Sequence, residues 1–174
     1  LEGLQSGIAK INRTTRRRFR ETFDQVNAKF REVFPRLFNG GQAELRLTDE
    51  EDLLETGVEI VAQPPGKKLQ NVSLLSGGER ALGAISFLFS LFLARPCAFY
   101  LLDEVEAALD DTNIGRFVEL LRRYADRAQF VVITHQKRTM EAADVLYGVT
   151  MGADGVSQIV SRRLPRAEAV AAAS

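Results

Sequence analysis

The sequence predicts an α/β fold in which a mostly parallel sheet is flanked by helices, preceded by a long N-terminal helix and a small antiparallel β element. Three patterns lead to this prediction. Apolar residues recur every three or four positions within residues 1–38, two short stretches alternate between apolar and polar residues within 43–61, and apolar strands alternate with helices after residue 69. Strands that alternate with helices are typical of parallel sheets covered on both faces.

The composition indicates one compact domain, or one domain with an extension, because the chain has 174 residues of which 45% are hydrophobic. The 23 basic and 23 acidic residues cancel, so the overall charge indicates neither a nucleic acid nor a membrane surface as a partner. Cys97 is the single cysteine, which excludes an internal disulfide and fits a reducing cytoplasm; we expect a small buried side chain. No signal peptide is recognisable, and because the chain opens at Leu1 without methionine we expect a fragment of a longer protein.

The most apolar stretch runs from Ala81 to Ala94. As a helix it would be roughly 21 Å long, which is shorter than the ~30 Å hydrocarbon core of a bilayer. We therefore expect a buried helix and no membrane partner.

Residues 1–38 are predicted to form one long helix, loosened near its end by Pro35. One apolar stripe is made by Phe19, Phe23, Val26, Phe30, Val33 and Leu37, and a second one upstream by Leu4, Ile8 and Ile11. The polar run 12–18 separates the stripes, so they do not share one heptad phase. The pattern indicates the end of a coiled coil that continues into a helix packed on a globular core, although an ordinary amphipathic helix fits it as well.

Asn39-Gly40-Gly41 ends this helix, because glycine readily takes a positive φ. The elements predicted after it are strands 43–47 and 57–61, a loop at 63–68, helix 80–94, strand 98–102, helix 113–124, strand 130–134, helix 138–143, and strands 145–151 and 156–160. The chain is thereby divided into helix 1–38, a lobe 39–164 and a flexible tail 165–174.

The first motif that carries chemistry is Leu75-Ser76-Gly77-Gly78-Glu79, directly before the long apolar helix. Two glycines at a helix start allow close approach to the backbone, where free N–H groups and the helix dipole favour an anion. The Ser76 hydroxyl adds a further donor. A plain N-cap with a flexible turn explains the same residues.

The second motif is an apolar strand, 98–102, that ends in Asp103 and Glu104. Ligands of open α/β sheets bind at this carboxyl edge. Successive strand side chains point in opposite directions, so one carboxylate can hold Mg²⁺ while the other orients or deprotonates water. A solvated acidic pair is the alternative.

The third motif is the single histidine, His135, which follows the apolar strand 130–134 and so reaches the same edge. A histidine there can hydrogen-bond a terminal phosphate. A structural histidine with satisfied hydrogen bonds remains the alternative.

The order of these motifs resembles the signature motif, Walker B motif and switch histidine of ABC-type ATPases. Ala107-Ala108-Leu109-Asp110-Asp111 is similar to the D-loop of that family, and 103–113 with Thr134-His135-Gln136-Lys137 resembles its bacterial SMC (structural maintenance of chromosomes) branch. The resemblance covers residues 1–164. No Gly-x-x-x-x-Gly-Lys-Ser/Thr occurs in the chain, which excludes a standalone P-loop NTPase. In SMC proteins that loop lies in a separate N-terminal half, so the chain is identified as the C-terminal lobe of an ABC-type ATPase head, with 1–38 as the coiled-coil end and head-entry helix.

The resemblance implies the cofactors ATP and Mg²⁺ and a role for each motif residue. Asp103 is expected to bind the metal, Glu104 to act as general base, and His135 to contact the nucleotide held by the N-terminal half. Ser76, Gly77 and Gly78 are expected to face ATP on a second head, with Glu79 supporting their loop, and Asp110 to couple the two sites.

The partners that the resemblance implies are the N-terminal head half, a second SMC head, the winged-helix domain of a kleisin subunit, and DNA, in a cytoplasmic, nucleoid-associated protein. Strands 43–61 and 145–160 are our expectation for the kleisin surface. Residues 1–38 carry nine basic and four acidic residues, a net charge of +5 that can contact phosphates. A solvated helix face explains that charge equally.

Two other functions compete with a chromosome-organising ATPase. A DNA-repair ABC ATPase shares the three motifs, so only the stretch 105–113 argues against it. A structural dimerisation head with degenerate sites is disfavoured by the intact Ser76, Asp103, Glu104 and His135.

Overall fold

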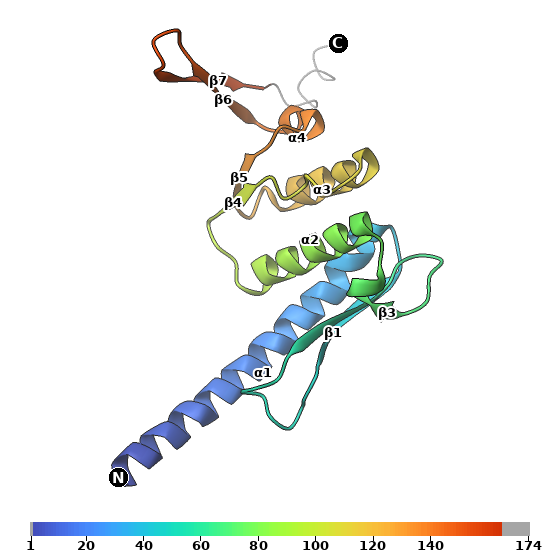
Figure 1. Ribbon diagram of the computed structural model, residues 1–174, viewed down its shortest axis with the longest axis vertical. Coiled ribbons are helices and arrows are strands. Elements are labelled where there is room, and N and C mark those ends of the chain that lie inside the picture. Colours follow the sequence, from blue (N-terminus) through green and yellow to red (C-terminus); the bar gives the residue numbers. More distant parts are fainter. Residues whose placement is uncertain (1, 165–174) are drawn as a thin grey trace.

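The computed structural model describes residues 2–164. Its elements are α1 (Glu2–Phe38), β1 (Gln42–Leu47), β2 (Val58–Gln63), β3 (Gln70–Asn71), a 3-10 turn (Val72–Leu74), α2 (Gly77–Ala94), β4 (Phe99–Asp103), α3 (Asp111–Tyr124), β5 (Gln129–Ile133), α4 (Lys137–Glu141), β6 (Val145–Met151) and β7 (Ser157–Arg163). Figure 1 shows the N-terminal end of α1 and the β6–β7 hairpin at opposite ends of the molecule. The predicted tail 165–174 lies outside the described residues.

The core forms where the second half of α1 packs along α2. Phe30, Val33 and Phe34 are fully buried, and Leu82 and Phe89 of α2 are nearly so. The predicted stripe is confirmed at Val26, Phe30, Val33 and Leu37, which are buried, whereas Phe19 and Phe23 are only partly buried and Phe34 was not predicted. The single long helix is confirmed and continues through Pro35 to Phe38. By contrast, the upstream residues Leu4, Ile8 and Ile11 are exposed, and the coiled coil predicted for them stays a prediction.

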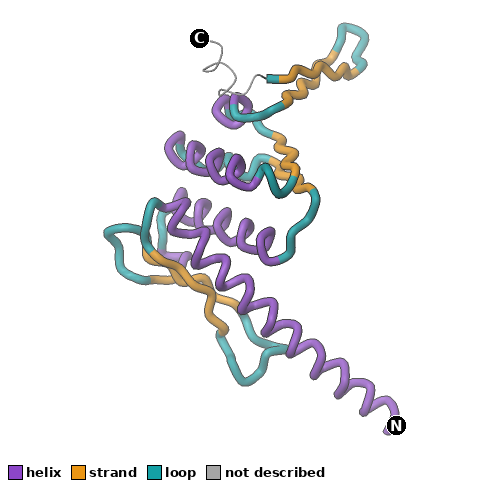
Figure 2. Tube along the Cα trace, turned by 180° about the vertical axis from the view of Figure 1, so that it is seen from behind, coloured by secondary structure: helices purple, strands orange, loops and turns teal. Residues whose placement is uncertain are grey.

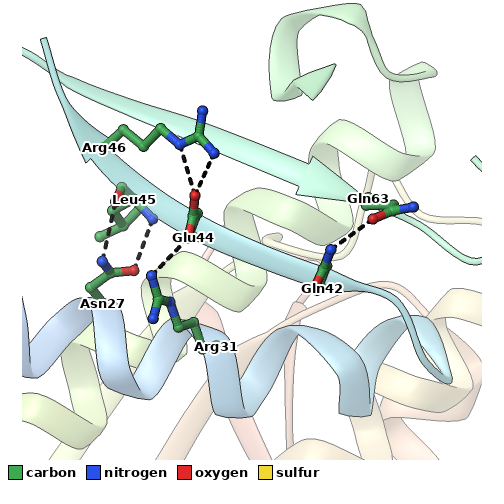
Figure 3. Close-up of polar contacts among 7 residues, drawn as sticks. All are labelled: Asn27, Arg31, Gln42, Glu44, Leu45, Arg46 and Gln63. Carbon is green, nitrogen blue, oxygen red and sulfur yellow. Dashed lines mark hydrogen bonds and ion pairs between the residues drawn. The ribbon is translucent and has the colours of Figure 1, made fainter. Parts of the chain in front are cut away.

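The antiparallel sheet β1-β2-β3 lies on α1 and is fixed to it by polar contacts, which Figure 3 shows. The Asn27 side chain donates to the Leu45 carbonyl (3.1 Å) and accepts from the Leu45 amide (2.9 Å). Arg31 forms an ion pair with Glu44 (2.7 Å). These bonds set the register between helix and sheet. The short strand β3 and the 3-10 turn after it were not predicted.

The predicted parallel sheet is seen only in part. Within residues 2–164, β4 and β5 form the one parallel pair, and the remaining strands form two separate antiparallel sheets. Figure 2 shows the strands in separate groups along the molecule. One face of the pair packs on the core through Tyr100, Leu102 and Phe130. The other face is open, with Phe99 and Leu101 64% and 63% exposed. Parallel strands are normally buried on both sides, so this face lacks its cover.

Two further predictions concern Cys97 and the apolar helix α2. Cys97, expected to be buried, is exposed in the loop before β4. By length and composition α2 is able to cross a bilayer, yet Leu82, Ile85 and Phe89 lie in the core shared with α1.

Candidate functional site

Asp103 and Glu104 lie at the carboxyl end of β4, as the sequence predicts. Strand alternation turns Leu102 into the core and leaves Asp103 on the exposed face. Within residues 2–164 the Asp103 carboxylate has no hydrogen-bonding or ion-pair partner. It is therefore available to a group from outside this chain.

Glu104 has a left-handed backbone conformation, with a φ of 47°. Among the described residues the one other non-glycine with a positive φ is Asn39, and asparagine tolerates this region better than glutamate. The Glu104 amide donates to the Ile133 carbonyl (2.9 Å), which ties the turn after β4 to the end of β5. Strain of this kind costs on the order of 1–3 kcal/mol and gathers at functional sites.

His135 is brought beside Glu104 by the parallel register, in which Asp103 pairs with Ile133. The His135 Nδ1 lies 3.2 Å from Glu104 Oε1, and its Nε2 lies 3.3 Å from the side-chain nitrogen of Gln136. Because an ionised carboxylate only accepts, the neutral ring that fits both contacts carries its proton on Nδ1, donates it to Glu104 and accepts at Nε2. The structure thus joins the predicted base and the predicted histidine at one sheet edge.

Ser76 and Glu79 form a capping box at the start of α2. Glu79 Oε2 accepts from the Ser76 hydroxyl (2.7 Å) and amide (3.0 Å), and Lys67 donates to the same oxygen (2.8 Å). The Lys67 ammonium, followed by the Ser76 donors, lowers the pKa of Glu79 from its ordinary value. Glu79 is therefore ionised at neutral pH and holds Ser76 in position.

Gly77 and Gly78 form the first turn of α2, which begins three residues before the predicted start at residue 80. Neither has a positive φ, and a Cβ added to either would meet nothing within 4 Å. Neither the conformation nor the packing of the described chain requires glycine there. The turn leaves backbone N–H groups at an open helix end, where anions bind favourably.

Asp110 is the N-cap of α3, and its side chain accepts from the Asn113 amide (2.8 Å). It is exposed. The cap explains an aspartate here by itself, so the coupling role remains a prediction.

The predicted residues thus fall into two groups, Ser76–Glu79 and Asp103, Glu104 and His135, and no hydrogen bond or ion pair within residues 2–164 joins them. In this same part of the chain no three side chains of His, Cys, Asp or Glu gather as a metal site. Magnesium keeps several waters and takes few protein ligands, so one free carboxylate, Asp103, fits it when a nucleotide supplies the remaining oxygens.

Sequence reasoning assigned no supporting role to four residues that hold these groups in place. They are Lys67 beside Glu79, Gln136 beside His135, and the buried pair Glu106 and Thr134. Glu106 carried a detectable signal, since an acidic residue in the otherwise apolar stretch 105–109 has to find a buried partner.

The description of the matching family model is "RecF/RecN/SMC N terminal domain", and the match covers residues 9–158. The chain is 59% identical over 157 residues to the chromosome partition protein Smc of Bacillus subtilis, covering 90% of this chain and 13% of that protein. It is 54% identical over 169 residues to the Smc protein of Myxococcus xanthus, covering 97% of this chain and 14% of that protein. The chain therefore spans about a seventh of the length of these relatives.

Solved structures share the fold. One comes from work on the structural biochemistry of ATP-driven dimerization and DNA-stimulated activation of SMC ATPases. Its TM-score is 0.79 at 37% identity, and the match covers 91% of this chain and 96% of that one. Another is an Smc head domain with an extended coiled coil, from Pyrococcus furiosus, bound to the C-terminal domain of ScpA. Its TM-score is 0.80 at 38% identity, and the match covers 99% of this chain and 43% of that one.

Proposed function

Since the chain belongs to the RecF/RecN/SMC family, we propose that it is the C-terminal half of an SMC ATPase head, active only with an N-terminal half and a second head. The family model is described as an N-terminal domain, but this chain has the signature, the Asp-Glu strand end and the histidine, and lacks the loop that wraps the β- and γ-phosphates. The relatives described above are chromosome partition proteins, which favours this branch over DNA repair.

The open face of β4 and β5 supports an N-terminal half as partner. Phe99, Leu101 and Ile133 are each more than half exposed on that face. A parallel pair of strands needs cover on both sides, and further strands of one sheet with their helices would provide it. Asp103 lies at the edge of this same face, so the partner that covers it also brings a phosphate-binding loop to the carboxylates.

The glycine turn at the start of α2 supports a second head as partner, and it is the observation that carries the proposal. Each glycine in a helix costs up to about 1 kcal/mol relative to alanine, and nothing in the described chain requires either one. Open space above Gly77 and Gly78 suits the γ-phosphate of ATP held by another head. ATP would then join two heads, and its hydrolysis would release them.

The chemistry is transfer of the γ-phosphoryl group to water, in which positioning and charge stabilisation provide most of the catalysis. Glu104 takes the proton of the attacking water as the oxygen–phosphorus bond forms and the bond to the β-phosphate oxygen breaks. As a general base it contributes roughly 10²–10⁴-fold. His135 orients Glu104 through the Nδ1 hydrogen bond, and Asp103 would hold Mg²⁺, which neutralises phosphate charge when bound.

A kleisin winged-helix domain is a further proposed partner, because solved Smc heads are described in complex with that domain of ScpA. Of the two strand groups expected to bind it, β6–β7 is the better supported. Tyr147, Val149 and Ile159 are 69%, 73% and 72% exposed, whereas β1 and β2 bury Ala43, Leu45 and Val61. An exposed apolar hairpin is a surface that a partner covers.

DNA contacts through α1 would rest on few residues. Six of its nine basic side chains form ion pairs, among them Arg16–Asp52 and Arg31–Glu44. Within residues 2–164 the cations of α1 without an ion pair are Lys10, Arg13 and Arg18. We expect these three to carry phosphate contacts.

A mixing experiment tests the trans arrangement. One head carries Ser76→Arg and an intact phosphate loop, and the other carries a wild-type signature but no functional phosphate loop. Each alone should be inactive, and their mixture should regain ATPase activity, because ATP on the first head meets an intact signature on the second. Ser73→Arg, a change of an exposed serine three residues upstream, is the matched control and should stay active alone.

An inert mixture beside active Ser73→Arg heads would contradict the trans arrangement. Because Ser76 caps α2 in either case, a melt of Ser76→Arg should show a loss of about 1 kcal/mol, and a much larger loss would assign the inactivity to misfolding.

A further inference from the structure

Glu106 is a buried carboxylate for which the proposed reaction has no direct use. It is 1% exposed and lies in the turn between Glu104 and Asp110. Its Oε1 accepts from the Thr134 hydroxyl (2.5 Å), and its Oε2 has no hydrogen-bond partner within residues 2–164. Burying a carboxylate with half of its acceptors unused is costly, so an acidic residue here requires an explanation.

Thr134 connects the Glu106 carboxylate to the turn after β5, which carries His135. Its hydroxyl has one proton, which is donated to Glu106, and its oxygen accepts the Gln136 amide proton (2.9 Å). When the Thr134 hydroxyl proton points to Glu106 Oε1, the lone pairs of the same oxygen are left to accept the Gln136 amide proton. Both hydrogen bonds therefore have a fixed direction. His135 lies between Thr134 and Gln136, so its backbone is held on both sides while its ring remains exposed.

On the other side of the Glu106–Thr134 hydrogen bond, Glu106 belongs to the turn that carries Glu104. The Ala107 amide donates to the Glu104 carbonyl (3.1 Å), and the Leu109 amide donates to the Glu106 carbonyl (2.9 Å). Glu106 is therefore part of the turn that starts at Glu104 and leads to the N-cap Asp110. Its side chain joins this turn to the one that follows β5.

We propose that Glu106 is a positioning residue that sets the His135 ring against Glu104 by holding Thr134. It does not contact nucleotide or water, and its effect on turnover rests on the proposed ATPase function. The same link makes the turn before Asp110 and the turn of His135 move as one unit.

The test uses the head reconstituted from this chain and its N-terminal half. Thr134→Val removes the hydroxyl but keeps the side-chain shape, whereas Thr134→Ser keeps the hydroxyl and removes only the methyl group. Thr139→Val is the matched control, because Thr139 is also a buried threonine, 6% exposed, whose hydroxyl has no partner within the described residues. Glu106→Gln keeps an acceptor for Thr134, and Glu106→Leu removes it.

The first readout needs no ATP. His135 is the single histidine of this chain, so labelling this chain alone with ¹⁵N gives one assignable set of ring signals. Thr134→Val and Glu106→Leu should shift the Nδ1 and Nε2 resonances away from the tautomer with a proton on Nδ1, whereas Thr139→Val and Thr134→Ser should not. Unchanged ring signals in Thr134→Val and Glu106→Leu would overturn the proposal.

The second readout is turnover. Thr134→Val and Glu106→Leu should lower kcat by roughly 10–100-fold at unchanged KM for ATP, since small misplacement of reacting groups has effects of this size. Glu106→Gln and Thr134→Ser should stay within a few-fold of wild type. An equal loss in Thr139→Val would show a merely structural effect and refute the positioning role. An inactive wild-type head would refute the proposed ATPase instead, and the ring signals would still decide the role of Glu106.

Discussion

The two adjacent glycine pairs of this chain, Gly40-Gly41 and Gly77-Gly78, have opposite relations to the fold. Gly40 and Gly41 have φ values of +125° and +75°, and a Cβ on Gly41 would collide with the Gln63 carbonyl oxygen. Gly77 and Gly78 are helical, have no positive φ, and have open space where a Cβ would stand.

The difference separates residues that the fold requires from residues that it merely accepts. The first pair ends α1 and lets the chain pass close to β2, so its glycines are explained within the described structure. The second pair weakens the first turn of α2 relative to alanine, and neither backbone conformation nor packing within residues 2–164 explains it. In the proposed function, the reason for Gly77 and Gly78 is a second head that approaches this turn.

The largest effect is expected for Gly41→Ala. The variant combines an unfavourable left-handed φ with a backbone collision and should lower the free energy of unfolding by roughly 3 kcal/mol, measured by chemical denaturation of the reconstituted head. Gly66→Ala is the control, because Gly66 has a φ of +76° but nothing within 4 Å of a Cβ. It should cost only about 1–2 kcal/mol. Equal losses would show that the collision at Gly41 is relieved by movement of the β2 end.

A smaller effect of the opposite sign is expected for Gly77→Ala and Gly78→Ala. Each should raise the free energy of unfolding by up to about 1 kcal/mol, because alanine is the better helix former. ATP-dependent association of heads, followed by size-exclusion chromatography, should weaken in the same variants. Variants that are more stable and associate normally would remove the argument for a partner at this turn.

The smallest effect is expected for Lys67→Met, which tests how the glycine turn is supported. Lys67 is the first cause of the lowered pKa of Glu79, so its removal should move that pKa upward toward the ordinary glutamate value. Because the pKa of Glu79 is depressed in the folded chain, its contribution to stability is complete above the unfolded pKa and is lost as the pH falls through the folded one. Lys67→Met should therefore lower stability at neutral pH by less than about 1 kcal/mol and shrink the loss on acidification. NMR titration of the Glu79 carboxyl carbon measures the shift, and an unchanged pKa would show that the Ser76 donors alone hold it.

The sequence predicted helices and strands well where periodicity decides, and the meeting of Glu104 with His135 followed from parallel strands ending at one edge. It placed the start of α2 too late, because Gly77 and Gly78 resemble a turn and only the capping box of Ser76 and Glu79 shows that they are helical. The contacts of Lys67 and of Glu106 depend on the paths of loops, which no local pattern encodes. The sheet was overestimated because strand patterns do not reveal that neighbouring strands are absent from residues 2–164.

The unbroken helix α1 also has a mechanical consequence. Its second half is fixed to the core, and the outermost tie is the ion pair of Arg16 with Asp52 (3.3 Å). The segment before Arg16 extends about 21 Å beyond that tie, at about 1.5 Å per residue. If this rigid segment pivots at the Arg16–Asp52 tie, a tilt of about 15° moves its N-terminal end by roughly 5 Å. Small rearrangements of the globular part would thus reach the N-terminal end of α1 as enlarged movements.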